Sequence, residues 1–123
     1  MIAADTSAWI DYSKGTESRG AKQLEMALSH GNLVMPLPVV FEILSGTGLT
    51  KGAEGAIQQL PQLEILPGYW QRAGTARRNL LQKGFKARAM DCLIAQACMD
   101  HDIALIAADS DFRHFQKMGL KLV

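Results

Sequence analysis

Two short stretches at opposite ends of the chain decide the fold: "MIAADTSAWI" (residues 1–10) and "IALIAADSDF" (residues 103–112). In each stretch an apolar run stops at an aspartate that is followed by a hydroxyl residue, as Asp5-Thr6 in the first and Asp109-Ser110 in the second. Short apolar runs with such boundaries are typical of buried strands. We expect each carboxylate to follow a strand and to precede a helix.

The segments between these two stretches alternate between helix and strand patterns. Helical spacing predicts helices near residues 21–28, 70–81 and 90–98, and shorter ones within 38–45, 51–60 and 110–118. Weaker strand patterns occupy residues 33–36, 63–66 and 120–123. This alternation predicts an α/β fold in which helices cover both faces of a parallel sheet. No change in composition marks a boundary, so we expect one domain spanning residues 1–123.

The topology suggests why the chain carries two such aspartates. In open parallel sheets, functional groups gather at the carboxyl ends of the strands. If the two strands are neighbours, Asp5 and Asp109 point into one crevice.

Composition excludes several classes of protein. No apolar run approaches the roughly 20 residues that cross a bilayer, so we expect no membrane association. The first residues contain an early acid and no basic segment, which argues against a signal peptide. Cys92 and Cys98 lie six residues apart in a helical pattern, a spacing that suits neither a metal-binding motif nor a disulfide framework. A reducing cytoplasm is the expected location.

The basic residues are unevenly distributed, although the formal net charge is only +1. Residues 67–90 contain no Asp or Glu but hold six of the 13 Lys and Arg residues. These six are Arg72, Arg77, Arg78, Lys83, Lys86 and Arg88. The stretch is either a solvated helix face with a loop or a patch that faces phosphates.

Two further acids interrupt apolar helices: Glu42 in "VVFEIL" and Asp91 in "AMDCLIAQA". Taken singly, each acid has an ordinary explanation, because an acid in a first turn favours the helix dipole and an aspartate before a helix can cap it. Taken together, converging carboxylates repel one another by roughly 4 kcal/mol per pair at ~4 Å in a medium of effective dielectric near 20. Such a cluster requires a cation, and hard oxygen ligands select Mg²⁺ or Mn²⁺. These metals suit phosphodiester hydrolysis, because they polarise the phosphate and lower the pKa of the attacking water.

At this point the motifs carry a family resemblance. The order of "DTS" after the first strand, Glu in an apolar helix, "DCLIAQA" at the start of a late helix and "AADSDF" after the next strand resembles PIN-domain ribonucleases, most closely VapC-type toxins of toxin–antitoxin pairs. The resemblance spans essentially the whole chain. It is specific at both ends and in residues 86–112, and weak across residues 46–80. It implies a PIN-like three-layer α/β/α fold around a central, mostly parallel sheet of about four to five strands.

The resemblance also implies roles for particular residues. The acids that match the family's catalytic, metal-binding set are Asp5, Glu42, Asp91 and Asp109. Asp111 matches a further acid, and Thr6 or Ser7 matches a hydroxyl that supports the first aspartate. The chain departs from the family pattern at Ala107, where Thr is common, and we expect weaker positioning of Asp109 as a result.

The activity that the resemblance implies is a Mg²⁺- or Mn²⁺-dependent endoribonuclease. It also implies a cognate antitoxin that holds the enzyme inactive, and a homodimer. The sequence does not say which RNA is cut or at which bond.

Two other functions stay open at this stage. A phosphoryl-accepting receiver-like domain would need an acidic pair after its first strand and an acceptor Asp after its third, but the third predicted strand runs "LEILPG" without one. Labelling by a small phosphodonor would separate this hypothesis from a nuclease. A non-catalytic RNA-binding or interaction protein on the same fold is the other alternative, and the four intact acids argue against it.

Overall fold

The computed structural model describes residues 1–123 and contains two strands and seven helices. The elements in chain order are β1 (Ile2–Ala4), α1 (Thr6–Ser13), α2 (Arg19–Ser29), α3 (Leu37–Leu44), α4 (Lys51–Gln58), α5 (Tyr69–Gln82), α6 (Ala89–Asp100), β2 (Ala104–Ile106) and the 3₁₀ helix η1 (Ser110–Met118). Every helix predicted from apolar spacing is present. The last one differs from the expectation only in its tighter 3₁₀ winding.

The sheet is parallel, as predicted, but its regular strands are fewer. β1 and β2 pair in parallel, with Ala4 opposite Ile106. Single parallel bridges extend the sheet from Ile2 to Leu33, from Met35 to Gln62 and from Leu105 to Leu122. The expected four to five strands are therefore two strands and three bridged segments. Proline explains part of the difference, because Pro36 follows Met35 directly and has no N–H to continue the ladder.

The strand register corrects one feature of the sequence analysis. Because Ala4 lies opposite Ile106, Asp5 follows β1 directly, whereas Asp109 comes three residues after the end of β2. The sequence Ile-Ala-Ala-Asp occurs at residues 2–5 and again at 106–109, but the two copies do not occupy equivalent positions in the sheet. Ala107 and Ala108, which separate Asp109 from the end of β2, form a short segment that crosses the end of β1.

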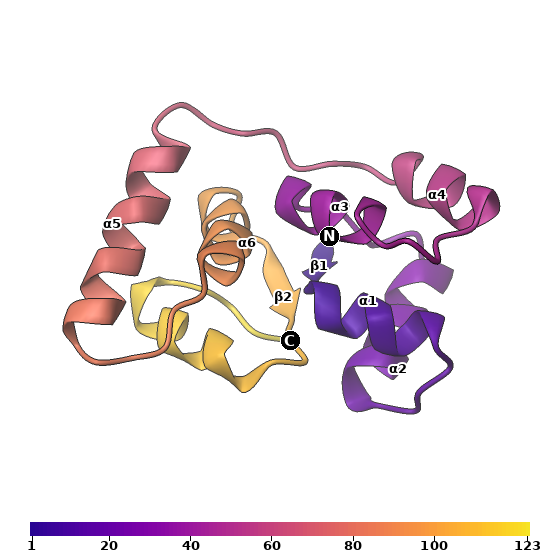
Figure 1. Cartoon of the computed structure of the whole chain (residues 1–123), viewed down its shortest axis with the longest axis horizontal. Coiled ribbons are helices and arrows are strands. Elements are labelled where there is room, and N and C mark those ends of the chain that lie inside the picture. Colours follow the sequence, from indigo (N-terminus) through magenta and orange to yellow (C-terminus); the bar gives the residue numbers. More distant parts are fainter.

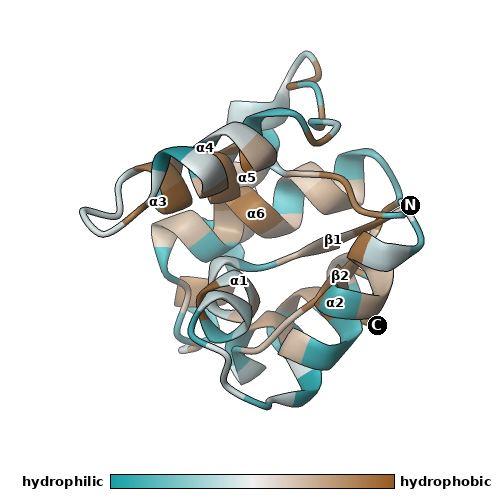
Figure 2. Cartoon of the chain, turned by 90° about the vertical axis from the view of Figure 1, so that its right-hand side faces the viewer, coloured by the Kyte–Doolittle hydropathy of each residue, from teal (hydrophilic) through white to brown (hydrophobic).

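Helices cover both faces of the strands. On one side, α2 contacts both strands and packs against α1. On the other side, α6 contacts β2 and packs against α5 and α3. Figure 2 shows β1 and β2 between these two layers, and Figure 1 shows α1 and α2 on one side of the strands and α5 and α6 on the other. One cluster of 26 buried residues forms the core. No helix is both long enough and apolar enough to span a membrane.

A candidate carboxylate site at the ends of the strands

Asp5 is the most buried of the candidate acids, with 2% of its surface exposed. Its Oδ1 accepts a hydrogen bond from Ala8 N at 2.8 Å and thereby caps α1. Its Oδ2 accepts hydrogen bonds from Ala108 N at 2.9 Å and Asp109 N at 3.2 Å. A carboxylate oxygen has two lone pairs, so Oδ2 is saturated and Oδ1 keeps one position free. Burial raises the pKa of Asp5, and these three hydrogen bonds oppose that rise.

Glu42 reaches the same place from α3. The chain enters this helix through Pro36 and Pro38, whose fixed φ suits a first helical turn. Thr6 Oγ1 donates a hydrogen bond to Glu42 Oε1 at 2.6 Å. The hydroxyl after the first aspartate therefore bonds Glu42, whereas the family resemblance suggested support for Asp5. Ser7, the other candidate hydroxyl, is exposed and makes no hydrogen bond within the chain.

Asp91 lies in the first turn of α6, and its carboxylate is poorly compensated. Its Oδ2 is buried and has no hydrogen-bond partner. Burial is the main cause that raises the pKa of Asp91 to about 6, and the negative charge of Asp109 comes next. Arg88 opposes the rise, while the charges of Asp5 and Glu42 add to it. The charges of Asp109, Asp5 and Glu42 therefore all reach Asp91.

Asp109 is the N-cap of η1, and its Oδ1 accepts a hydrogen bond from Asp111 N at 2.9 Å. This bond positions Asp109 although Ala107 supplies no hydroxyl. Asp111 itself lies at the edge of the site, where its Oδ2 is 3.9 Å from Lys86 Nζ. A pair this long and this exposed contributes little to stability.

The donor chemistry of the four acids fits a hard divalent cation. All the candidate ligand atoms are carboxylate oxygens. One of them, Asp91 Oδ2, is buried without a hydrogen-bond partner, and a bound cation would compensate its charge. No three of the chain's His, Cys, Asp or Glu side chains stand close enough together to hold one ion at once. Mg²⁺ is commonly bound through one or two carboxylates and keeps several waters, so this open arrangement suits it better than a closed zinc site.

The six candidate RNA-binding cations do not form one patch around the acids. Arg72 binds both oxygens of Asp100, from Nε at 3.0 Å and from Nη2 at 2.6 Å. Asp100 is nine residues after Asp91 in α6, which at 1.5 Å per residue places it about 13 Å along the helix. Arg72 is therefore held at the end of α6 remote from the acids.

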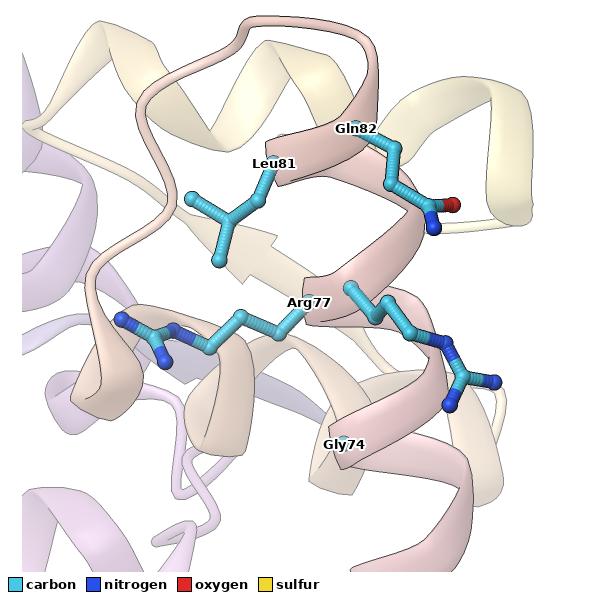
Figure 3. Close-up of a pocket in the computed structure, with 5 residues that line it drawn as sticks. Gly74, Arg77, Leu81 and Gln82 are labelled. Atoms are coloured by element: carbon cyan, nitrogen blue, oxygen red, sulfur yellow. The ribbon is translucent and has the colours of Figure 1, made fainter.

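The other five cations differ in what surrounds them. Arg77 Nε donates to Ala87 O at 2.9 Å and ties α5 to the segment before α6. Arg77 also lines an open hollow of about 420 Å³ with Gly74, Arg78, Leu81 and Gln82, and Figure 3 shows Arg77 and Leu81 on the same side of α5.

The cations that adjoin the acidic site are Lys86, through Asp111, and Arg88, through Asp91. Arg78 and Lys83 have exposed side chains that form no ion pair or hydrogen bond within the chain.

The sequence analysis missed the backbone donors of the site. The N–H groups of Ala108 and Asp109 fix the buried oxygen of Asp5, yet no side chain marks them. They become apparent only from the pairing of Ala4 with Ile106, which leaves Ala107 and Ala108 between the end of β2 and Asp109.

Comparison with known proteins identifies the family of the chain. The PIN domain family matches residues 2–118, and the chain belongs to this family. It is 32% identical over 119 residues to ribonuclease VapC11 of Mycobacterium tuberculosis and, equally, to a VapC ribonuclease of Mycobacterium bovis. Each match covers 91% of this chain and 89% of the relative.

Solved structures support the fold. The chain is similar to VapBC2 from Rickettsia felis bound to a DNA fragment from their promoter, with a TM-score of 0.71, 19% identity and coverage of 100% of this chain and 98% of that one. It is also similar to FitAcB from Neisseria gonorrhoeae, with a TM-score of 0.65, 15% identity and coverage of 99% and 96%. The predicted PIN-like α/β fold is confirmed.

Proposed function

We propose that this chain is a Mg²⁺- or Mn²⁺-dependent endoribonuclease and the toxin of a toxin–antitoxin pair. The observation that carries the proposal is the set of four carboxylates from four separate segments, of which Asp91 has a buried oxygen without a partner. The relatives named as VapC ribonucleases, which match over 91% of the chain, support the same activity.

The proposed reaction is hydrolysis of an RNA phosphodiester bond. The oxygen of a water forms a bond to phosphorus, the bond from phosphorus to the leaving ribose oxygen breaks, and the water's proton passes to solvent while the leaving oxygen gains one. A bound Mg²⁺ or Mn²⁺ would polarise the phosphate and lower the pKa of the attacking water. Asp5 through Oδ1 and Asp91 through Oδ2 have free lone pairs to hold this cation, and Asp109 and Glu42 complete the negative field.

The chain's own contribution is to fix these carboxylates before RNA arrives. Three backbone N–H groups hold Asp5, the Thr6 hydroxyl holds Glu42, and the Asp111 N–H holds Asp109. Sites arranged in advance cost no reorganisation during the reaction. Among the cations, Lys86 and Arg88 are the best placed to bind RNA phosphates beside the acids, and the contact of Arg72 with Asp100 favours a structural role for it.

The proposed protein partners are a cognate antitoxin and a second copy of the chain. Large apolar side chains are exposed on α1 (Ile10 and Tyr12) and on α3 (Phe41 and Leu44), and Phe41 is 66% exposed. Apolar exposure of this kind favours a protein partner over solvent. A basic side chain of an antitoxin would be attracted to the uncompensated carboxylates. We place the pair in the cytoplasm, where the buried thiols Cys92 and Cys98 would stay reduced.

The test is cleavage of a fluorophore–quencher RNA by the purified chain with Mn²⁺, Mg²⁺ or EDTA. We expect cleavage with either metal, none in EDTA, and a loss of at least a hundredfold in Asp91→Asn and Asp109→Asn, because each change removes a metal-ligating charge. Asp102→Asn is the matched control, since Asp102 is exposed and has φ of 53°, a conformation that Asn tolerates. Undiminished cleavage by Asp91→Asn would overturn the proposal. RNA binding without cleavage in either metal would favour the non-catalytic alternative.

A further inference from the structure

An aromatic ring stands at the surface of the segment between α5 and α6. Phe85 is 42% exposed and belongs neither to the core cluster nor to the side chains that pack against it. Gly84, with φ of 82°, turns the chain into this position, and Phe85 N donates to Leu80 O at 3.0 Å. The backbone of Phe85 is thus anchored while its side chain stays outside the core.

The ring of Phe85 lies parallel to the imidazole of His114 in η1. The ring centroids are 4.3 Å apart and the planes differ by 22°. This stack covers one face of Phe85 and fixes its orientation. Because 42% of the Phe85 surface stays exposed beside this stack, a flat group has room to contact the ring.

The stack stands at the rim of the acidic site. Lys86, next to Phe85, approaches Asp111, and Asp111 holds Asp109 through its backbone N–H. Arg88 lies just before α6 and is close enough to Asp91 to lower the pKa of that carboxyl. Within four residues the segment therefore presents one exposed ring and two cations, of which Lys86 approaches Asp111 and Arg88 lies near Asp91.

An exposed aromatic ring flanked by Lys and Arg is the combination that binds single-stranded nucleic acid, because a base stacks on the ring while the cations meet the phosphates. The neighbouring chain favours a polyanion over a protein surface, since Lys83, Lys86 and Arg88 flank Phe85 and residues 67–90 hold no acid. Building on the proposed ribonuclease function, we propose that Phe85, backed by His114, stacks against a base of the RNA strand and positions its backbone, through Lys86 and Arg88, at the carboxylates.

The proposal is tested by binding in EDTA, where cleavage does not interfere. Fluorescence anisotropy would measure the Kd of the full chain for a labelled ten-nucleotide oligoadenylate and for an abasic ribose-phosphate strand of equal length. We expect Phe85→Leu to weaken oligoadenylate binding about tenfold and to leave abasic binding unchanged, because only the base–ring contact is lost. Phe85→Trp should retain binding. Leu81→Gln is the matched control, since Leu81 is a similarly exposed apolar residue that does not stack.

Lys86→Gln separates the charge contribution from the stacking contribution. This change should weaken the binding of both probes to the same extent. It should also reduce the slope of log Kd against log salt concentration by about one, the contribution of a single phosphate contact. Equal oligoadenylate binding by wild type and Phe85→Leu, with both folded by circular dichroism, would overturn the proposal. The same would follow if Phe85→Leu lost self-association in light scattering while keeping RNA affinity, because the ring would then belong to a protein interface. A chain that shows the stacking signature but does not cleave RNA in Mn²⁺ would refute the nuclease function alone.

Discussion

Asp91→Asn should stabilise the metal-free protein while it abolishes RNA cleavage. Asp91 Oδ2 is buried without a partner, and burial together with the charge of Asp109 raises its pKa from 3.8 to about 6. That difference corresponds to roughly 3 kcal/mol of unfavourable charge in the folded state. Because the carboxyl is only about half buried, solvent screening reduces this to about 1–2 kcal/mol. Asn keeps the shape of the side chain and removes the charge.

The sign of this effect can be checked against pH. Since the pKa of Asp91 is raised on folding, its protonation stabilises the folded state fully below pH 3.8, and that stability is lost as the pH rises through about 6. In EDTA, the free energy of unfolding of the wild type should therefore lose about 1–2 kcal/mol across this window. Asp91→Asn should lack this loss and should melt several degrees higher than the wild type at pH 7.5.

The assay is urea and thermal denaturation of both proteins at pH 4.5 and 7.5, in EDTA and in Mn²⁺. Mn²⁺ should stabilise the wild type and not the variant, because binding to the folded state alone raises its stability. Asp102→Asn should follow the wild type closely, because the ion pair that it removes, with Lys121, is exposed and contributes little to stability. A lower melting temperature for Asp91→Asn at pH 7.5 in EDTA would refute the reasoning, because it would show that the carboxylate makes a stabilising contact.

Three further outcomes follow from the hydrogen bonds of the site. Asp5→Asn should lower the free energy of unfolding in EDTA by about 1–3 kcal/mol, since an amide cannot accept all three backbone N–H bonds; an unchanged urea midpoint would contradict this. Thr6→Val should lower kcat more than it raises KM, because the hydroxyl that orients Glu42 is lost, whereas Thr6→Ser should retain activity. Arg72→Gln should reduce the melting temperature without changing oligoadenylate affinity, as its contact with Asp100 is remote from the acids; weaker RNA binding in this variant would return Arg72 to the RNA surface.

The helices were predictable from sequence because their signals are local. Apolar spacing marks α2, α5 and α6, and the Pro-led run marks α3. The four acids were recognisable because each interrupts or ends an apolar segment. Strand length was not predictable, since the bridges at Leu33 and Gln62 depend on which chain segment lies alongside them.

The hydrogen-bond partners of the side chains could not be predicted from the sequence either. Thr6 is adjacent to Asp5 in the chain, but its hydroxyl bonds Glu42, 36 residues away. That choice depends on where α3 crosses α1. The sequence alone also predicts that Asp5→Asn leaves the metal-free fold equally stable or more stable, because carboxylate repulsion is relieved. The three hydrogen bonds to Asp5 argue for the opposite outcome, and two of them become visible only with the register of β1 and β2.

The four carboxylates differ in how the fold compensates their charge. Asp5 has three N–H donors, Glu42 has a hydroxyl, and Asp109 has one N–H, but Asp91 Oδ2 has no donor. The repulsion within the site is therefore concentrated on the side chain that lies nearest the cation Arg88 and the proposed path of the RNA. A divalent ion bound beside Asp91 would relieve this uncompensated charge, whereas the backbone and Thr6 already hold the other acids. This division explains how the backbone can hold one acid in place at the end of β1, while the first turn of α6 carries an acid whose charge only a bound cation would relieve.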